Sequence, residues 1–152
     1  MPIPLLQKMR MLASADATIQ SYCLGTNGTF RWFDTQLPKG YVQQGTCVRV
    51  RQISSLLYYV QNGPINQDQV QVQIDVLDMS STTAKALAAY LVSTWFPSVD
   101  FTTGSQFLSP PGPPLASPNF KLSQRSGLDY TVLPEAPYVE TLTYRIWNNI
   151  DV

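Results

Sequence analysis

The clearest pattern of hydrophobic and polar positions lies in the middle of the chain and predicts a strand followed by a helix. Apolar residues at every second position of 69–77 alternate with Gln69, Gln71, Gln73 and Asp75. Such alternation is typical of a strand with one face on a core and the other in water or in a polar interface. Residues 80–96 then carry apolar side chains every three or four positions, which predicts an amphipathic helix with an N-terminal serine cap, ended by Pro97.

Weaker patterns predict the other elements. Pro4 suits the start of a helix over 4–12, and Ser14-Ala15-Asp16 offers an N-cap for a second short helix over 17–23. In the segment 46–53, Val48 and Val50 alternate with Arg49 and Arg51, as in a strand. Further strands are predicted over 29–34, 56–60, 119–124 and 138–147, with turns over 25–28 and 62–64 and a loop over 128–137.

Residues 102–118 differ from the rest of the chain because they are rich in proline, glycine and serine. This composition predicts a long loop with polyproline character inside one domain that spans 1–152. Loops of this length in a compact domain usually have a function or are disordered. Phe107 and Leu108 lie there among small and polar residues, so we expect them to contact a partner rather than fill the core.

Composition and charge exclude some classes of protein function. Only 13% of the 152 residues are charged, and ten basic residues balance ten acidic ones. This balance excludes a polycation that wraps nucleic acid, and low charge at zero net charge favours association. The longest apolar run, 86–92, is far shorter than the roughly 18 residues of a membrane span. We therefore expect a protein made in a cytoplasm, without a membrane segment.

Candidate catalytic chemistry is sparse. Histidine is absent, which removes Ser–His–Asp and Cys–His nucleophiles. Cys23 and Cys47 cannot form a four-ligand zinc site, and we expect two buried free thiols. Asp68, Asp75 and Asp78 could hold a hard cation, but no ligand-dense loop accompanies them. The simpler interpretation is that Asp78 helps to cap the following helix and Asp75 is solvated, so we expect no enzyme activity, metal or cofactor.

Charge is unevenly spread along the chain and suggests an interface. Residues 1–51 contain six basic and two acidic residues, whereas 52–100 contain one basic and four acidic residues. Complementary patches of this kind can join subunits head to tail. The candidate basic side is Arg49 and Arg51, and the candidate acidic side is Asp68, Asp75 and Asp78. The polar strand face adds Gln71 and Gln73.

Three passages resemble a known family. They are Val70-Gln-Val-Gln-Ile-Asp-Val, the alanine-rich Ala84-Lys-Ala-Leu-Ala-Ala-Tyr-Leu-Val, and the closing Tyr144-Arg-Ile-Trp. Their order, a glutamine-rich strand that runs into an alanine-rich helix and a later closing strand, is similar to the tail terminator or tail-completion proteins of long-tailed bacteriophages. The resemblance covers roughly residues 5–96 and 138–147.

The resemblance implies an α+β fold, with two main helices packed on one face of a mostly antiparallel sheet. It further implies a homo-oligomeric ring of six subunits at the head–tail junction of the virion. There the ring would cap the tail tube, end its polymerisation and join it to the head. Its partners would be the major tail tube protein and the head-side connector or stopper protein, and DNA could pass through the ring without specific recognition. Two alternatives remain open: another head–tail joining or minor tail protein, and a small α+β ligand-binding or enzyme domain.

Overall fold

A five-stranded sheet organises the protein. The computed structural model describes residues 3–25, 28–36, 45–60, 63–101, 112–114, 120–129 and 138–149. The strands are β1 (Trp32–Asp34), β2 (Cys47–Val60), β3 (Gly63–Asp78), β4 (Phe120–Asp129) and β5 (Tyr138–Asn149), in the spatial order β1-β2-β3-β5-β4. Only β1 and β2 are parallel, and the other neighbouring strands are antiparallel. The expected α+β fold with a mostly antiparallel sheet is confirmed.

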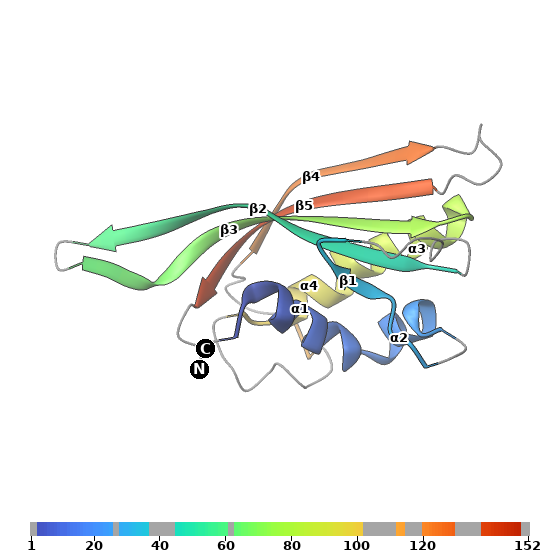
Figure 1. Cartoon of the computed structure of the whole chain (residues 1–152), viewed down its shortest axis with the longest axis horizontal. Coiled ribbons are helices and arrows are strands. Elements are labelled where there is room, and N and C mark those ends of the chain that lie inside the picture. The colour runs from blue at the N-terminus through green and yellow to red at the C-terminus, as the bar shows by residue number, and fades with distance from the viewer. Residues whose placement is uncertain are drawn as a thin grey trace.

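The helices cover one face of this sheet (Figure 1). They are α1 (Leu5–Ser14), α2 (Ala17–Cys23) and a longer helix made of α3 (Ser81–Tyr90), η2 (Leu91–Trp95) and α4 (Phe96–Ser98). Asp16 caps α2, as predicted, by accepting a hydrogen bond from the Ile19 N–H at 2.9 Å. The Tyr90 hydroxyl donates to the other oxygen of the same carboxylate at 2.7 Å, which ties α2 to α3.

The core lies between the helices and the sheet face that they cover. As the alternation predicted, alternate residues in the described parts of three strands point into it: Val48 and Val50 of β2, Val70, Val72, Ile74 and Val76 of β3, and Leu142, Tyr144 and Ile146 of β5. Leu87, Leu91 and Trp95 from the long helix are fully buried against these strands, and each such side chain contributes roughly 1.5–3 kcal/mol. Phe96 stacks on Tyr144 of β5 with 3.7 Å between ring centroids.

The long helix does not end at Pro97, contrary to the sequence prediction. It continues to Ser98 through η2, a π-helical turn in which the Phe96 N–H donates to the Leu91 carbonyl five residues earlier. Proline has no N–H, and its ring crowds the carbonyl four residues before it, here that of Ser93. The wider π turn gives the ring room, so the chain keeps its helical direction past the proline.

All five strands differ from the predicted bounds. β3 begins at Gly63, inside the turn predicted over 62–64 and six residues before the strand predicted over 69–77, and β5 continues to Asn149. β2 joins the two strands predicted over 46–53 and 56–60, with irregular pairing between Gln52 and Ser54 and again between Leu57 and Tyr59. β4 runs to Asp129, into the predicted loop over 128–137, and β1 contains only the last three residues of 29–34. The β2–β3 hairpin extends well beyond the helices (Figure 1).

Two other expectations concern the proline-rich stretch and membranes. Most of residues 102–118 lies outside the described part of the chain, Phe107 and Leu108 included. Among the described residues, no helix is long and apolar enough to cross a membrane.

Candidate interaction surface

The sheet face turned away from the helices is polar, and we call it the outer sheet face. Pairing of the strands brings its side chains together in rows, because residues opposite one another in the register share a face. Its polar members are Arg49, Arg51 and Ser54 of β2, Gln69, Gln71, Gln73 and Asp75 of β3, Thr141, Thr143 and Arg145 of β5, and Lys121, Gln124 and Ser126 of β4. The same face also contains Trp147, opposite Gln69, and at its other end the apolar residues Cys47, Leu77 and Val139.

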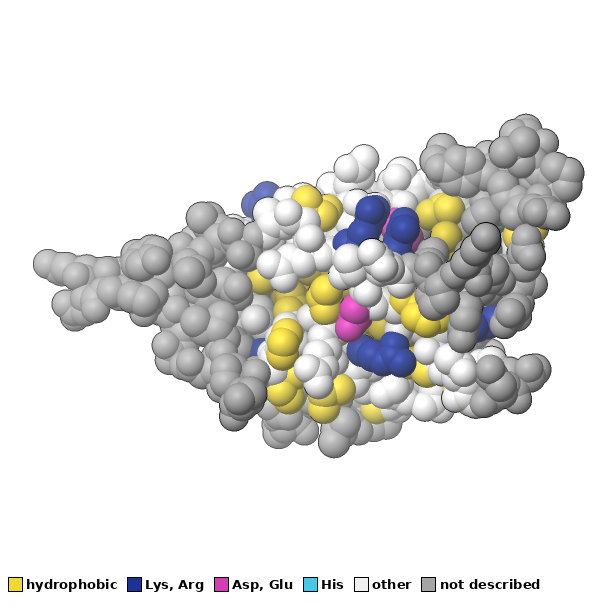
Figure 2. All heavy atoms as spheres, in the orientation of Figure 1, with side chains coloured by type: hydrophobic (Ala, Val, Ile, Leu, Met, Phe, Trp, Pro, Cys, Tyr) yellow, Lys and Arg dark blue, Asp and Glu magenta, His cyan; other side chains and the backbone are white. Residues whose placement is uncertain are grey.

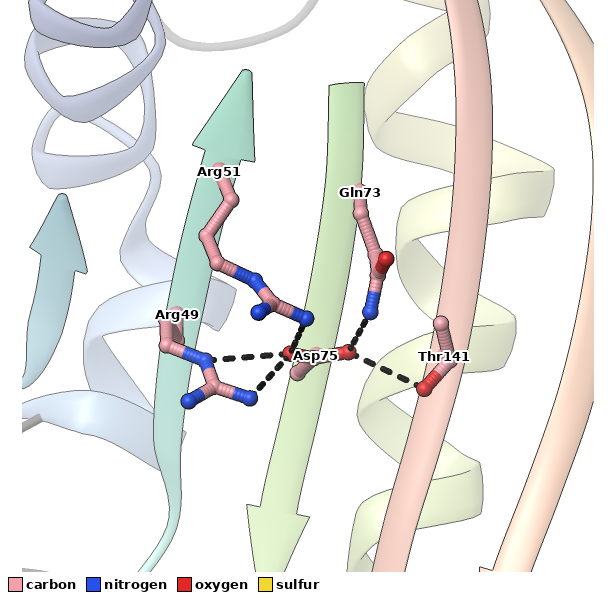
Figure 3. Close-up of polar contacts among 5 residues, drawn as sticks. All are labelled: Arg49, Arg51, Gln73, Asp75 and Thr141. Carbon is pink, nitrogen blue, oxygen red and sulfur yellow. Dashed lines mark hydrogen bonds and ion pairs between the residues drawn. The ribbon is translucent and has the colours of Figure 1, made fainter. Parts of the chain in front are cut away.

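Asp75 is the centre of a hydrogen-bonded cluster on this face (Figure 3). The Arg49 Nε and Nη2 groups donate to its Oδ2 at 3.0 and 2.6 Å, and Arg51 Nη2 lies 3.4 Å from the same oxygen. The Gln73 amide and the Thr141 hydroxyl each donate to Oδ1 at 3.0 Å. Arg49 and Thr141 are the direct cross-strand neighbours of Asp75, so the register itself places these donors.

Asp75 is therefore buried and not solvated, which corrects the interpretation from sequence. Its side chain is only 1% exposed, while those of Arg49 and Arg51 are 28% and 40% exposed. A buried carboxylate needs charged or hydrogen-bonding partners, and here four side chains supply them. Because Arg49 and Arg51 pair with Asp75 inside one chain, these residues do not form two separate complementary patches.

The other acidic candidates lie apart from this cluster. Asp78 ends β3, where its Oδ1 accepts a hydrogen bond from the Ser80 N–H at 2.7 Å and its Oδ2 accepts one from the Thr46 hydroxyl. Asp78 thus holds the turn before α3, whereas the cap of the helix is the hydroxyl of Ser80, which accepts a hydrogen bond from the Thr83 N–H. For Asp68 only the backbone position in β3 is described, opposite Leu57. Among the described side chains, no group of three histidine, cysteine, aspartate or glutamate residues could hold a metal ion.

The other end of the outer sheet face carries two cations that the sequence analysis did not select. Lys121 of β4 lies directly opposite Arg145 of β5, and both side chains are exposed. Beside Arg145 is a hollow of about 220 Å³, lined by Arg145, Ser54, Gln69 and Gln71. Arg145 alternates visibly with the core positions of its strand, but nothing in the sequence shows that Lys121 lies opposite it.

The described acidic side chains are mostly inside the protein, while many basic ones are outside. Asp16, Asp75, Asp78 and Glu140 are buried, and Lys85, Lys121, Arg125 and Arg145 are exposed. Burial acts to raise the pKa of Glu140, but hydrogen bonds from Tyr138 and Arg125 together with the positive charges of Arg125 and Lys85 outweigh it and lower that pKa. On the side seen in Figure 2, the visible acidic side chains lie beside basic ones. Among the described side chains, the exposed charge is therefore mostly positive.

The two cysteines are buried and free, as predicted. Burial is the largest cause that raises the pKa of Cys23 to about 12 and that of Cys47 to about 11. Thiols of this kind stay protonated near neutral pH and are poor nucleophiles.

A comparison of the sequence with known protein families matches none of them, and a search of curated proteins finds no significant relative.

Proposed function

We propose that this protein is a structural subunit of a phage virion. In this proposal, copies of the chain form a ring, most simply of six, at the head-proximal end of the tail tube. The ring ends polymerisation of the tube and joins it to the head-side connector. The number of subunits and the partners come from the resemblance of residues 70–76, 84–92 and 144–147 to tail terminator proteins.

The observation that carries the proposal is the outer sheet face. It is a broad surface of amide, hydroxyl and guanidinium groups on the side of the sheet opposite the helices. Such groups can exchange hydrogen bonds with water for hydrogen bonds with a partner. Non-obligate interfaces, whose partners also exist alone in solution, are about as polar as the rest of a protein surface. The Asp75 cluster holds part of this face rigid, so less side-chain entropy is lost when a partner binds.

The alternative of a small ligand-binding or enzyme domain has less support. Ligand pockets are typically about 300–1,000 Å³ and mostly apolar. The hollow beside Arg145 is smaller, at about 220 Å³, and its four lining side chains are polar. A site of this size and chemistry fits a group on the surface of a partner better than a whole small molecule.

Localisation on the particle tests the proposal. Gold-labelled antibodies against the protein should bind at the head–tail junction of purified virions in electron micrographs. Sedimentation of the native assembly should give a closed oligomer, about 102 kDa for six subunits of 17.0 kDa. Label on the capsid shell or along the tail shaft would contradict the proposed position, and a strict monomer in both free and virion-extracted material would contradict a ring.

A further inference from the structure

Lys121 and Arg145 form an exposed pair of like charges on neighbouring strands. They occupy directly opposed positions of β4 and β5. Among the described side chains, the ion pairs within 4.0 Å are Arg49–Asp75, Arg51–Asp75 and Arg125–Glu140, so neither Lys121 nor Arg145 has a carboxylate partner there. Like charges directly opposite on a sheet destabilise it. The pair is therefore a local weakness that a bound anion would relieve.

The hollow beside Arg145 is suited to a carboxylate group. Arg145, Ser54, Gln69 and Gln71 line its volume of about 220 Å³, and each has a hydrogen-bond donor. The Ser54 hydroxyl donates a long hydrogen bond to the Gln71 Oε1 atom at 3.4 Å, so a carboxylate would compete with this bond for the Ser54 hydroxyl. A planar guanidinium matches the two oxygens of a carboxylate, so Arg145 is the natural anchor.

Arg51 extends the same positive surface toward β2. Its side chain is 40% exposed and its Nη2 lies 3.4 Å from Asp75, a long contact that a partner could replace. The outer sheet face thus holds four cations, Lys121, Arg145, Arg49 and Arg51, against the single described carboxylate of Asp75. It carries an excess of three positive charges on a chain whose net charge is zero.

The composition of the face favours a protein over a nucleic acid. Specific DNA-binding proteins commonly neutralise about six to ten phosphates, more than three excess charges allow. The face also has acceptor atoms, on Gln73, Thr143 and Gln124. Phosphate oxygens only accept hydrogen bonds, so a row of phosphates could not satisfy these acceptors. A protein surface offers carboxylates together with N–H and O–H donors. The described surface of a second copy offers this face few carboxylates, because four of the described ones are buried, Asp100 is half-buried and only Asp34 is exposed.

We propose that the outer sheet face docks an acidic surface of a different protein, and that Arg145 and Lys121 bind the carboxylates of that surface. This inference deepens the proposed function and rests on it, since the acidic protein would be the structural neighbour of this subunit in the virion. It places the centre of the contact on the β5–β4 side of the sheet, away from the Asp75 cluster.

The test measures binding of two labelled probes to the full-length protein by fluorescence anisotropy at low ionic strength. The probes are a decaglutamate peptide and a duplex DNA. The variants are Arg145→Gln and Lys121→Gln, with Lys85→Gln as the matched control. Lys85 is an exposed lysine of α3 and is absent from the outer sheet face, so all three variants lose one positive charge.

We expect decaglutamate to bind, and each of R145Q and K121Q to weaken this binding about two- to fivefold while K85Q leaves it unchanged. The thermal midpoint should stay the same or rise in K121Q, because repulsion between the two cations is removed. Undetectable peptide binding, equal weakening by K85Q, or tighter binding of DNA than of the peptide would each overturn the inference. The particle-labelling experiment is separate, so failure of the proposed function would be recognised independently.

Discussion

Replacing Arg49 by methionine should destabilise the protein far more than the same replacement at Arg51. Methionine keeps much of the length and apolar contact of the arginine stem but removes its charge. In Arg49→Met, the carboxylate of Asp75, which is 1% exposed in the wild-type protein, loses its two hydrogen bonds from Arg49, at 3.0 and 2.6 Å. Only the 3.4 Å contact with Arg51 and two neutral donors remain.

The size of the effect follows from this geometry. Removing one partner of a fully buried ion pair costs about 3–5 kcal/mol. Arg49 is 28% exposed, so water screens part of its interaction, and Arg51 can move closer to the carboxylate. We therefore expect R49M to lower the free energy of unfolding by about 2–3 kcal/mol. In R51M a 40% exposed side chain and a 3.4 Å contact are lost, and the effect should be about 0.2–1 kcal/mol.

Urea unfolding followed by tryptophan fluorescence can measure both variants, because Trp32 and Trp95 are fully buried. For a chain of this length, R49M should also lower the thermal midpoint by about 4–12 °C. Adding Asp75→Asn to R49M removes the uncompensated charge, and we expect the double variant to be more stable than R49M alone. Equal effects of R49M and R51M, or a double variant less stable than R49M, would refute the assignment of Arg49 as the main partner of a buried carboxylate.

Two further predictions concern packing and pH. Gly127→Ala should destabilise the fold by about 1–3 kcal/mol in thermal melts, because an added Cβ would clash with the Tyr138 hydroxyl oxygen. Gly112→Ala is the control: an added Cβ there would have no atom within 4 Å, so stability should change by less than about 0.5 kcal/mol. The protein should also lose stability as pH rises from about 9 toward 11 and 12, since Cys23 and Cys47 ionise near 9 when unfolded and resist ionisation when folded. A Cys23→Ala, Cys47→Ala double variant should show a smaller decline in chemical unfolding at these pH values, and an unchanged decline would contradict this cause.

Local patterns predicted most elements of the fold, because each depends on the chemistry of a few neighbouring residues. The alternation in β3 and β5 and the apolar stripe of α3 correspond to the buried faces in the structure. The Asp16 cap also followed from a single side chain at the right place. The errors arose where contacts distant in sequence decide the outcome. Pairing with β5 extends β4 to Asp129, and pairing with β3 carries β2 through its irregular positions.

The candidate surface was predicted only in part, for the same reason. The sequence places Asp75 on a polar strand face but does not show that Arg49 and Thr141 flank it on the neighbouring strands. An aspartate among glutamines therefore looked solvated, although four side chains enclose it. The pairing of Lys121 with Arg145 is likewise invisible, since the two residues are 24 positions apart in the sequence and only the register of β4 and β5 joins them.

Net charge was a poor guide to this surface because it does not distinguish buried charges from exposed ones. A buried, paired carboxylate such as Glu140 or Asp75 contributes little field at the surface, whereas an exposed Arg145 contributes its full charge, screened by salt. The two sides of the outer sheet face then have different roles. Around Asp75 both cations pair with a carboxylate of the same chain and support the fold, while Arg145 and Lys121 have no such partner among the described side chains and repel each other. Exposed like charges that lower the stability of a fold are expected mainly where a binding partner supplies the opposite charge. An interface mapped on the outer sheet face should therefore centre on β5 and β4, which carry Arg145 and Lys121.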